Sequence, residues 1–264
     1  MICPAALLLG IDHAVAWRNP PLLLYMRSMV QGEIRRIFSH SASAQRRFLR
    51  RHAATLARVI KITADTVAEG RTLFFFGNGG SAADAQHLAA EFVNRYKLPR
   101  AGLPALALTT DTSVLTSIAN DCGYAEVFAK QIQALGRPGD LAFAISTSGN
   151  ASNVLRAVAS CRRLGITTVG LTGGSGGKLA GRVDHLLCVD GSHDTARIQE
   201  THILIGHAVC ELVEKQVAAA GHELRPATRR RDTGSLAPRV GRQKERPREP
   251  RPRSRNGGGK TSAR

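Results

Sequence analysis

The sequence predicts an α/β domain built as a three-layer sandwich, with helices on both faces of a five-stranded parallel sheet. Five short apolar runs alternate with longer segments of helical periodicity over most of the 264 residues. Such alternation favours parallel strands that are covered on both faces. A long helix is predicted before the first strand, so the sandwich is preceded by an N-terminal helical segment.

The first helix is predicted from about residue 29 to residue 68. Its apolar residues recur at steps of three or four residues or their sum, and arginine-rich positions lie between them. The apolar residues are Leu49, Ala53, Leu56, Ile60 and Val67. This spacing places them on one side of a helix. Gly70 then provides a stop signal.

After the first helix, strands alternate with helical segments. Strands are predicted at 72–76, 104–109, 141–146, 166–171 and 185–189. Helices are predicted at 82–95, 112–119, 124–135, 151–164, 177–181 and 196–218. In sheets of this kind, ligands bind in the loops at the carboxyl ends of the strands. The loops that follow the strands are therefore the first places to look for a site.

The chain divides into three parts by composition. We expect residues 1–28 to be an N-terminal extension, with Met26 or Met29 as the natural start, and residues 29–222 to be the folded domain. From Arg225 to Arg264 there are 14 Lys and Arg and 3 Asp and Glu, a net charge of +11 out of the chain's +17. We expect this basic tail, residues 223–264, to be disordered because it has few large apolar residues to bury. It is either a solvated appendage or an arm that contacts polyanions weakly.

The cysteines and the apolar segments indicate a cytoplasmic protein that does not enter a membrane. The number of cysteines is odd, and no two of them have C-x-x-C spacing. We expect them all to be reduced thiols: Cys3, Cys122, Cys161, Cys188 and Cys210. The run Leu7-Leu8-Leu9 is too short to span a membrane and lacks a basic flank.

Two of the loops after strands have the composition of a phosphate or sugar site. Gly77-Asn78-Gly79-Gly80-Ser81 allows backbone N–H groups to approach a ligand closely, and Ser81-x-x-Asp84 resembles a capping box that opens the next helix. Ser146-Thr147-Ser148-Gly149-Asn150 places three hydroxyl groups before a helix N-terminus, which suits an anion. Each loop alone could be a simple helix cap, but two in one sheet favour a binding site.

Two pairs of polar residues on separate helices are candidates for metal binding or proton transfer. His87 and Glu91 are four residues apart and can point at one target. Gln199 and His207 are eight apart and can share a side of their helix. Nitrogen and oxygen donors from two helices can hold a divalent metal such as zinc. The same side chains can also move protons, and the spacing does not decide between these roles.

Other candidate motifs are rejected. Gly173 to Lys178 resembles a nucleotide-binding P-loop, but it lacks the first glycine and has Leu179 where Ser or Thr should bind magnesium. His202 lies about 140° from His207 around its helix, so we interpret it as structural or solvated.

These motifs together resemble those of the phosphoheptose isomerases, which have the sugar-isomerase (SIS) fold, a flavodoxin-like arrangement. The resemblance rests on Gly-Asn-Gly-Gly-Ser-Ala-Ala-Asp-Ala-Gln-His-x-Ala-x-Glu, then Asn-Asp, Ser-Thr-Ser-Gly-Asn and Arg-Ile-Gln-Glu-x-His with a later His. It covers roughly residues 29–218. One departure is Ala151, where many members have a further phosphate-binding serine.

The resemblance implies particular site residues. It implies one zinc ion per subunit, held by His87, Glu91, Gln199 and His207. It implies a substrate site formed by Asn78, Gly79, Gly80, Ser81, Glu91, Asn120, Asp121, Ser146, Thr147, Ser148 and Gln199. It also implies a homotetramer in which the N-terminal helices bundle.

The reaction that the resemblance implies is an aldose–ketose isomerisation. Sedoheptulose 7-phosphate would become D-glycero-D-manno-heptose 7-phosphate, a precursor of lipopolysaccharide or other surface glycans. Glu91 is the expected catalytic base and His207 its acid/base partner. Two rival interpretations are an SIS isomerase for another phosphosugar and a non-catalytic protein that binds the replication initiator. The related initiator-binding protein lacks residues that correspond to Glu91 and His207, so their presence favours the enzyme.

Overall fold

The computed structural model describes residues 20–219, and side chains from residue 28 onward. The basic tail and residues 1–19, which include Cys3, lie outside the described residues. The first helix begins at Pro20, earlier than the predicted start near residue 29. The domain boundaries proposed at residues 28 and 222 stay predictions. The four other cysteines are free thiols. None of the helices within 20–219 is long and apolar enough to cross a membrane.

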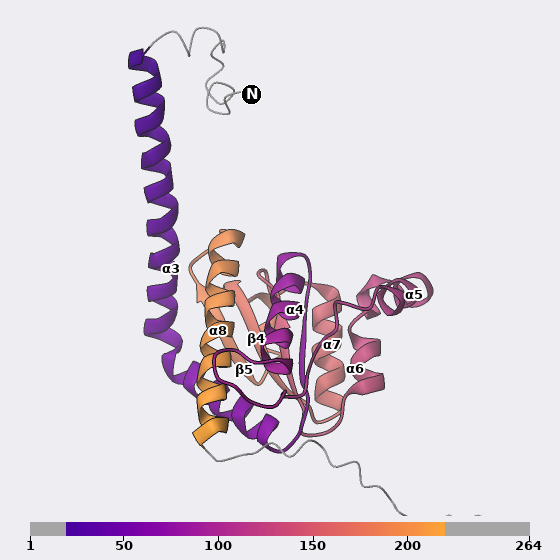
Figure 1. Cartoon of the computed structure of the whole chain (residues 1–264). Coiled ribbons are helices and arrows are strands. Elements are labelled where there is room, and N and C mark those ends of the chain that lie inside the picture. The colour runs from indigo at the N-terminus through magenta and orange to yellow at the C-terminus, as the bar shows by residue number, and fades with distance from the viewer. Residues whose placement is uncertain (1–19, 220–264) are drawn as a thin grey trace, which may run out of the picture. The chain divides into compact units, whose positions relative to one another are not determined.

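The predicted five-stranded parallel sheet is confirmed (Figure 1). Its strands are β1 (Leu73–Gly77), β2 (Ala105–Ala107), β3 (Leu141–Ile145), β4 (Thr167–Gly174) and β5 (His185–Asp190). They lie in the order β2-β1-β3-β4-β5, and every neighbouring pair is parallel. This is the flavodoxin-like order, in which the crevice for a ligand opens beside β1 and β3.

Helices separate the strands as the sequence predicts. They are α3 (Pro20–Ala68), α4 (Gly80–Val93), α5 (Thr112–Cys122), α6 (Ala129–Leu135), α7 (Ser152–Arg163) and α8 (Thr195–Ala219). Single 3-10 turns lie at Tyr124–Glu126 and Gly177–Leu179. The single helix predicted at 124–135 was wrong, because the 3-10 turn and α6 divide this segment. The fourth strand is longer than predicted, because Gly173 and Gly174 continue the pairing with β5.

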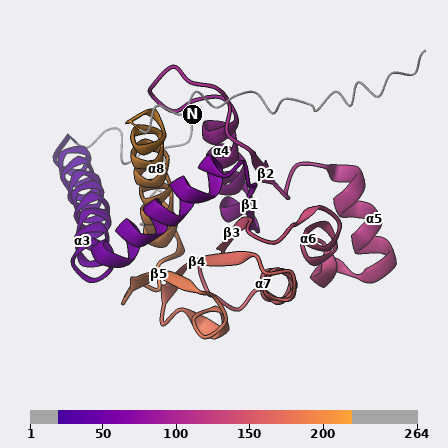
Figure 2. The same ribbon diagram turned by 90° about the horizontal axis from the view of Figure 1, so that it is seen from below.

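Alternate residues of β1 face two separate cores, which makes the sandwich three layers thick. Leu73 and Phe75 belong to the core beneath α3, α4 and α8. Phe74 and Phe76 belong to the core beneath α6 and α7. Figure 2 shows these two groups of helices on opposite sides of the strands. Since successive strand residues point to opposite faces, a continuous phenylalanine run can fill both cores.

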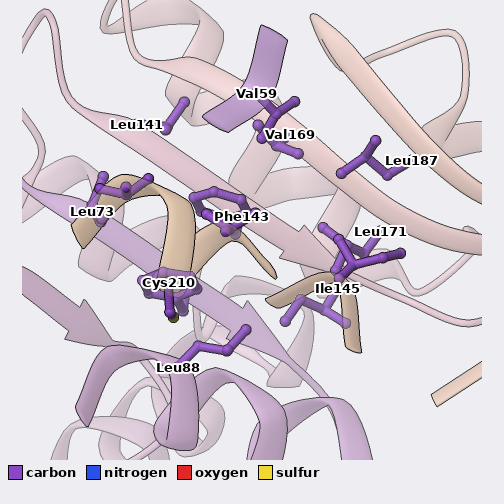
Figure 3. Packing of buried hydrophobic residues seen from close by; sticks show 14 of the residues in the cluster. Val59, Leu73, Leu88, Leu141, Phe143, Ile145, Val169, Leu171, Leu187 and Cys210 are labelled. Atoms are coloured by element: carbon purple, nitrogen blue, oxygen red, sulfur yellow. The ribbon is translucent and has the colours of Figure 1, made fainter. Parts of the chain in front are cut away.

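The core beside α4 and α8 fixes the two helices that carry the candidate catalytic residues. Leu88 of α4 and Cys210 of α8 lie in one buried cluster with Phe143 of β3 (Figure 3). Phe75 and Phe143 stack with their ring centroids 4.8 Å apart. A Cβ at Gly206 would lie within the space of the Leu88 side chain, so the glycine allows α4 and α8 to approach closely. This close approach brings side chains of the two helices together.

The long helix α3 contacts α8 and the last strand (Figure 1). His52 Nε2 lies 2.8 Å from Asp190 Oδ2 at the end of β5, and the His52 ring stacks on Phe48. Burial by itself raises the pKa of Asp190, but the hydrogen bonds from His52 and Cys188 and the charges of His52 and Arg51 together outweigh it and lower that pKa. The carboxylate therefore helps to hold α3 against the sheet.

Candidate active site

Three polar side chains from α4 and α8 meet at one point. His87 Nε2 lies 2.8 Å from His207 Nε2 and 3.6 Å from Glu91 Oε1. His87 and Glu91 are one turn apart on α4, and His207 reaches them from α8. The His87 side chain is 46% exposed and that of Glu91 is 23% exposed, so a small molecule can reach both. The arrangement joins two imidazoles and a carboxylate at a solvent-accessible position.

The surroundings of His207 favour its neutral form. Burial lowers the pKa of His207, and the neighbouring His87 lowers it further, while Glu91 acts in the opposite direction. The ring of Tyr96 lies beside it, with the two ring centroids 5.7 Å apart. A neutral imidazole can accept a proton or donate its lone pair to a metal. His207 is therefore suited to either of the roles considered from the sequence.

The donor set fits a zinc ion. Two imidazole nitrogens and a carboxylate oxygen are typical zinc ligands, and two nitrogens bound tetrahedrally at about 2.0–2.1 Å are roughly 3.3 Å apart. The observed 2.8 Å between the two Nε2 atoms is shorter, so the rings would separate slightly around an ion. Without such a movement, no group of three or more His, Cys, Asp or Glu side chains among the described residues has the geometry to hold a metal ion.

Gln199 lies beside the start of α4. It precedes His207 by eight residues, which is about 12 Å along a helix axis. Its side-chain amide lies against Gly80, where a Cβ would collide with Nε2 of Gln199. The structure thus places Gln199 at the glycine turn, which is the start of α4.

The glycine turn opens α4 without the predicted capping box. Gly79 is the N-cap residue, with φ +55°, and no side chain caps the helix. Ser81 is already inside the helix and is buried. The prediction that Ser81 and Asp84 cap α4 was wrong, because Gly79 allows a backbone turn in which the Ser81 N–H donates to the carbonyl of Asn78 and the Ala82 N–H to that of Gly79. Burial raises the pKa of Asp84, whose Oδ2 has no hydrogen-bond partner within residues 20–219.

A pair of asparagines connects the glycine turn to α7. Asn78 donates to Asn153 Oδ1 at 2.9 Å, and Asn153 donates back to Asn78 Oδ1 at 2.8 Å. The hydroxyl of Tyr124 also donates to Asn78 Oδ1 at 3.2 Å. The Asn78 oxygen thus accepts two hydrogen bonds, and one N–H of its amide stays available. Sequence reasoning missed Asn153 and Tyr124, because nothing in the local pattern marks contacts across 75 and 46 residues.

The hydroxyl-rich loop borders a polar cavity of about 300 Å³. The cavity is lined by Thr147, Ser148 and Asn150 together with Ser175, Ser192 and His193 from the ends of β4 and β5. Gly149 has φ +65°, and a Cβ there would collide with the carbonyl oxygen of Gly176. The loop therefore requires glycine at this position. Its hydroxyl groups surround a space of the size of a phosphate and part of a sugar.

Asn120 and Asp121 lie at the exposed end of α5 and hydrogen-bond to each other at 2.8 Å. Tyr124, three residues beyond Asp121, is the link from this segment to Asn78. The sequence-predicted residues thus lie at four places: the α4–α8 junction, the glycine turn, the end of α5 and the hydroxyl-rich loop.

The chain was also compared with known protein families and proteins. The SIS domain model matches residues 38–173. A phosphoheptose isomerase of Roseiflexus sp. (strain RS-1) is 53% identical over 175 residues, which cover 66% of this chain and 88% of the relative. One from Aquifex aeolicus (strain VF5) is 47% identical over 185 residues, covering 70% and 96%.

Solved structures of phosphoheptose isomerases are similar to this chain in both fold and sequence. A phosphoheptose isomerase from Neisseria gonorrhoeae has a TM-score of 0.66 at 40% identity, covering 70% of this chain and 99% of its own. One from Francisella tularensis has a TM-score of 0.68 at 34% identity, covering 70% and 98%. Fold and sequence therefore agree over nearly the whole length of these relatives.

Proposed function

Because the chain belongs to the phosphoheptose isomerases of the SIS-domain family, we propose that it interconverts sedoheptulose 7-phosphate and D-glycero-D-manno-heptose 7-phosphate. The structural observation that carries the proposal is the meeting of His87, Glu91 and His207. A binding protein without catalysis has no need for a carboxylate and two imidazoles at one accessible point. The product is a heptose precursor, and we place the reaction in lipopolysaccharide or other surface-glycan synthesis.

Glu91 is the proposed base of the isomerisation. The reaction moves one proton between C1 and C2 of the open-chain sugar through an enediol, and a carboxylate can accept and return that proton. His207 is its partner, which moves protons to and from the sugar oxygens. Its lowered pKa leaves the imidazole neutral near pH 7 and able to accept a proton. Together these side chains provide the two acid/base functions that the reaction requires.

The loops at the ends of the strands hold the substrate in our proposal. Ser146, Thr147 and Ser148 donate to the phosphate, assisted by the open N-terminus of α7. Asn78 offers its remaining N–H to a sugar oxygen, because its own oxygen is already occupied. Gly79 and Gly80 provide backbone N–H groups, and Ser81, whose own N–H donates to the carbonyl of Asn78, provides its hydroxyl. Asn120, Asp121 and Gln199 complete the substrate site that the family resemblance implies.

His87, Glu91 and His207 are also the proposed zinc ligands, with Gln199 as the fourth residue implied by the family. A zinc ion bound there would act as a Lewis acid that polarises the sugar carbonyl. A carboxylate that ligates zinc is a weaker base, so the two roles of Glu91 compete. The position of Gln199 at the glycine turn supports its substrate role more directly than its metal role.

We propose a cytoplasmic homotetramer as the working form. Support comes from apolar residues of α3 that are exposed in the single chain: Val30, Ile34, Ile37 and Phe38. An apolar cavity of about 450 Å³ lies further along α3, between Phe48, Leu49 and Leu56 and residues of α8 such as Leu204. Apolar stripes of this kind are characteristic of helix–helix interfaces.

The basic tail is proposed as an appendage that contacts polyanions weakly and takes no part in catalysis. Its support is the net charge of +11 between Arg225 and Arg264. Deleting residues 225–264 should weaken retention on heparin at low salt, because fewer counterions are released. The kcat should stay unchanged, and a large decrease would show that the tail belongs to the active enzyme.

The proposed function is tested by incubating the full chain with sedoheptulose 7-phosphate before and after treatment with a chelator. We expect heptose 7-phosphate to form, activity to fall on metal removal, and zinc to restore it. If the untreated, folded protein forms no aldose from this substrate, the proposed substrate is wrong. If it then isomerises another phosphosugar, the rival interpretation as an SIS isomerase for a different substrate is the correct one.

A further inference from the structure

A buried ion pair connects α8 to the loop that follows α4. The Glu214 carboxylate accepts four hydrogen bonds: from the backbone N–H groups of Tyr96, Lys97 and Leu98 at 3.0, 2.7 and 2.8 Å, and from Arg100 Nε at 2.9 Å. The side chain of Arg100 is 8% exposed and that of Glu214 is 1% exposed. Both carboxylate oxygens are therefore satisfied inside the protein.

The other side of Arg100 holds the end of α4. Its Nη2 donates to the carbonyl of Glu91 at 2.8 Å, and its Nη1 donates to the carbonyls of Phe92 and Ala101 at 2.9 Å each. The last carbonyls of a helix have no N–H partner within the helix. Arg100 supplies partners for two of them, one of which belongs to the proposed catalytic base. We refer to Arg100 and Glu214 together as the Arg100–Glu214 clasp.

The clasp lies next to the catalytic side chains on both helices. Glu214 follows His207 by seven residues, so the two lie on the same face of α8. Tyr96, whose backbone N–H bonds to Glu214, places its ring beside that of His207. Arg100 bonds to the main chain of Glu91. The clasp thus joins the segments that carry Glu91 and His207.

We propose that Arg100 and Glu214 are positioning residues, which set the distance of His87 and Glu91 from His207 by fixing the end of α4 against α8. This inference rests on the proposed function, because it concerns the same site. A buried ion pair is a poor source of stability, since apolar residues of similar volume often stabilise a fold as well or better. Its value is geometric: it fixes directions and distances that apolar contacts leave adjustable.

The electrostatics of the clasp agree with a fixed, ionised pair. Burial by itself raises the pKa of Glu214, but the backbone N–H donors and Arg100 outweigh it and lower that pKa. The carboxylate therefore stays charged at neutral pH and keeps all four donors. Catalysis is sensitive to such positioning, because a displacement of about 1 Å can cost roughly 10²-fold in rate.

The test is Glu214→Gln in the full chain. The new amide has one oxygen, and its NH₂ group would face N–H donors, so the loop and the end of α4 must shift. We expect kcat to fall by about 10–100-fold and zinc affinity, measured by competition with a chelator, to fall similarly, as for residues that orient metal ligands. The KM should change little, because the substrate loops follow other elements.

A matched control is Asp140→Asn. Asp140 is equally buried, and its carboxylate also accepts from backbone N–H groups, those of Thr72 and Arg137 at 2.9 and 2.7 Å. Neither donor belongs to α4 or α8. This variant should lower the melting temperature and leave kcat and zinc affinity at the parental values.

The proposal is overturned if Glu214→Gln behaves as Asp140→Asn does, with lower thermal stability but parental kcat and zinc affinity. If Glu214→Gln does not fold, Arg100→Lys carries the same test, because lysine keeps the ion pair but cannot reach the carbonyls of α4. If the parental protein does not isomerise sedoheptulose 7-phosphate, the proposed function fails. The zinc-affinity comparison then still decides whether the clasp positions His87, Glu91 and His207.

Discussion

His202 shows how one buried residue makes stability depend on pH. Its side chain is 1% exposed, and its Nε2 lies 3.0 Å from the carbonyl oxygen of Thr172. Burial lowers the pKa of His202 from 6.5 to about 4, and the hydrogen bond to Thr172 opposes this only in part. From the sequence, His202 was either structural or solvated, and its burial shows that it is structural. The unfolded chain, however, takes up a proton there at a higher pH than the folded chain does.

This difference predicts that the free energy of unfolding is highest above about pH 6.5 and decreases as the pH falls through the range between 6.5 and 4. The contribution of His202 is about 3 kcal/mol, from the linkage between proton binding and folding. Urea unfolding at a series of pH values measures it. His202→Gln removes the titrating group and should flatten the curve in this range. An unchanged slope in the variant would show that other groups cause the dependence.

At the scale of elements, the site is made by the close contact of two helices that are far apart in the sequence. Since α4 supplies His87 and Glu91 and α8 supplies His207, we expect about one zinc per subunit after gentle purification. His87→Ala and His207→Ala should each lower the zinc content. His185→Ala, which changes a histidine on β5 outside the site, should not. Full zinc content in both ligand variants would place the metal elsewhere.

The elements themselves were largely predictable from the sequence. Apolar runs and periodicity located all five strands and the main helices, because these patterns are local. The errors lie where the backbone depends on special geometry. Gly79 opens α4 without a side-chain cap, and the chain changes to a 3-10 turn at Tyr124 before α6 begins.

The candidate site was predictable only in part. His87, Glu91 and the two loops have local spacing that indicates their chemistry. The supporting residues have none, because Asn153, Arg100 and Glu214 act on partners 75 to 117 residues away or through main-chain groups. In a sequence, Glu214 is indistinguishable from a solvated charge on the surface of a helix. Only the packing of α8 against the loop after α4 reveals that it is buried.

At the scale of the whole molecule, assembly should depend on the exposed apolar stripe of α3. Phe38 is 73% exposed and Ile34 is 49% exposed, and the two are one helical turn apart. A charge that is buried in an interface without an opposite charge beside it destabilises that interface. Phe38→Asp should therefore shift the protein from the proposed tetramer to smaller species, as measured by light scattering after size-exclusion chromatography.

The control for assembly is Leu135→Asp, which adds the same charge at an exposed leucine of α6 on the other side of the sheet. It should leave the molar mass unchanged. A parental molar mass for Phe38→Asp as well would show that the α3 stripe is not the subunit interface.

We propose that this chain isomerises sedoheptulose 7-phosphate with Glu91 as the base. The most direct measurement follows the formation of D-glycero-D-manno-heptose 7-phosphate by NMR with the parental protein and with Glu91→Gln. The substitution is nearly isosteric, so thermal stability should be retained. The rate should fall by about 10²–10⁴-fold, the usual cost of losing a general base. Product formation by Glu91→Gln at the parental rate would contradict the account.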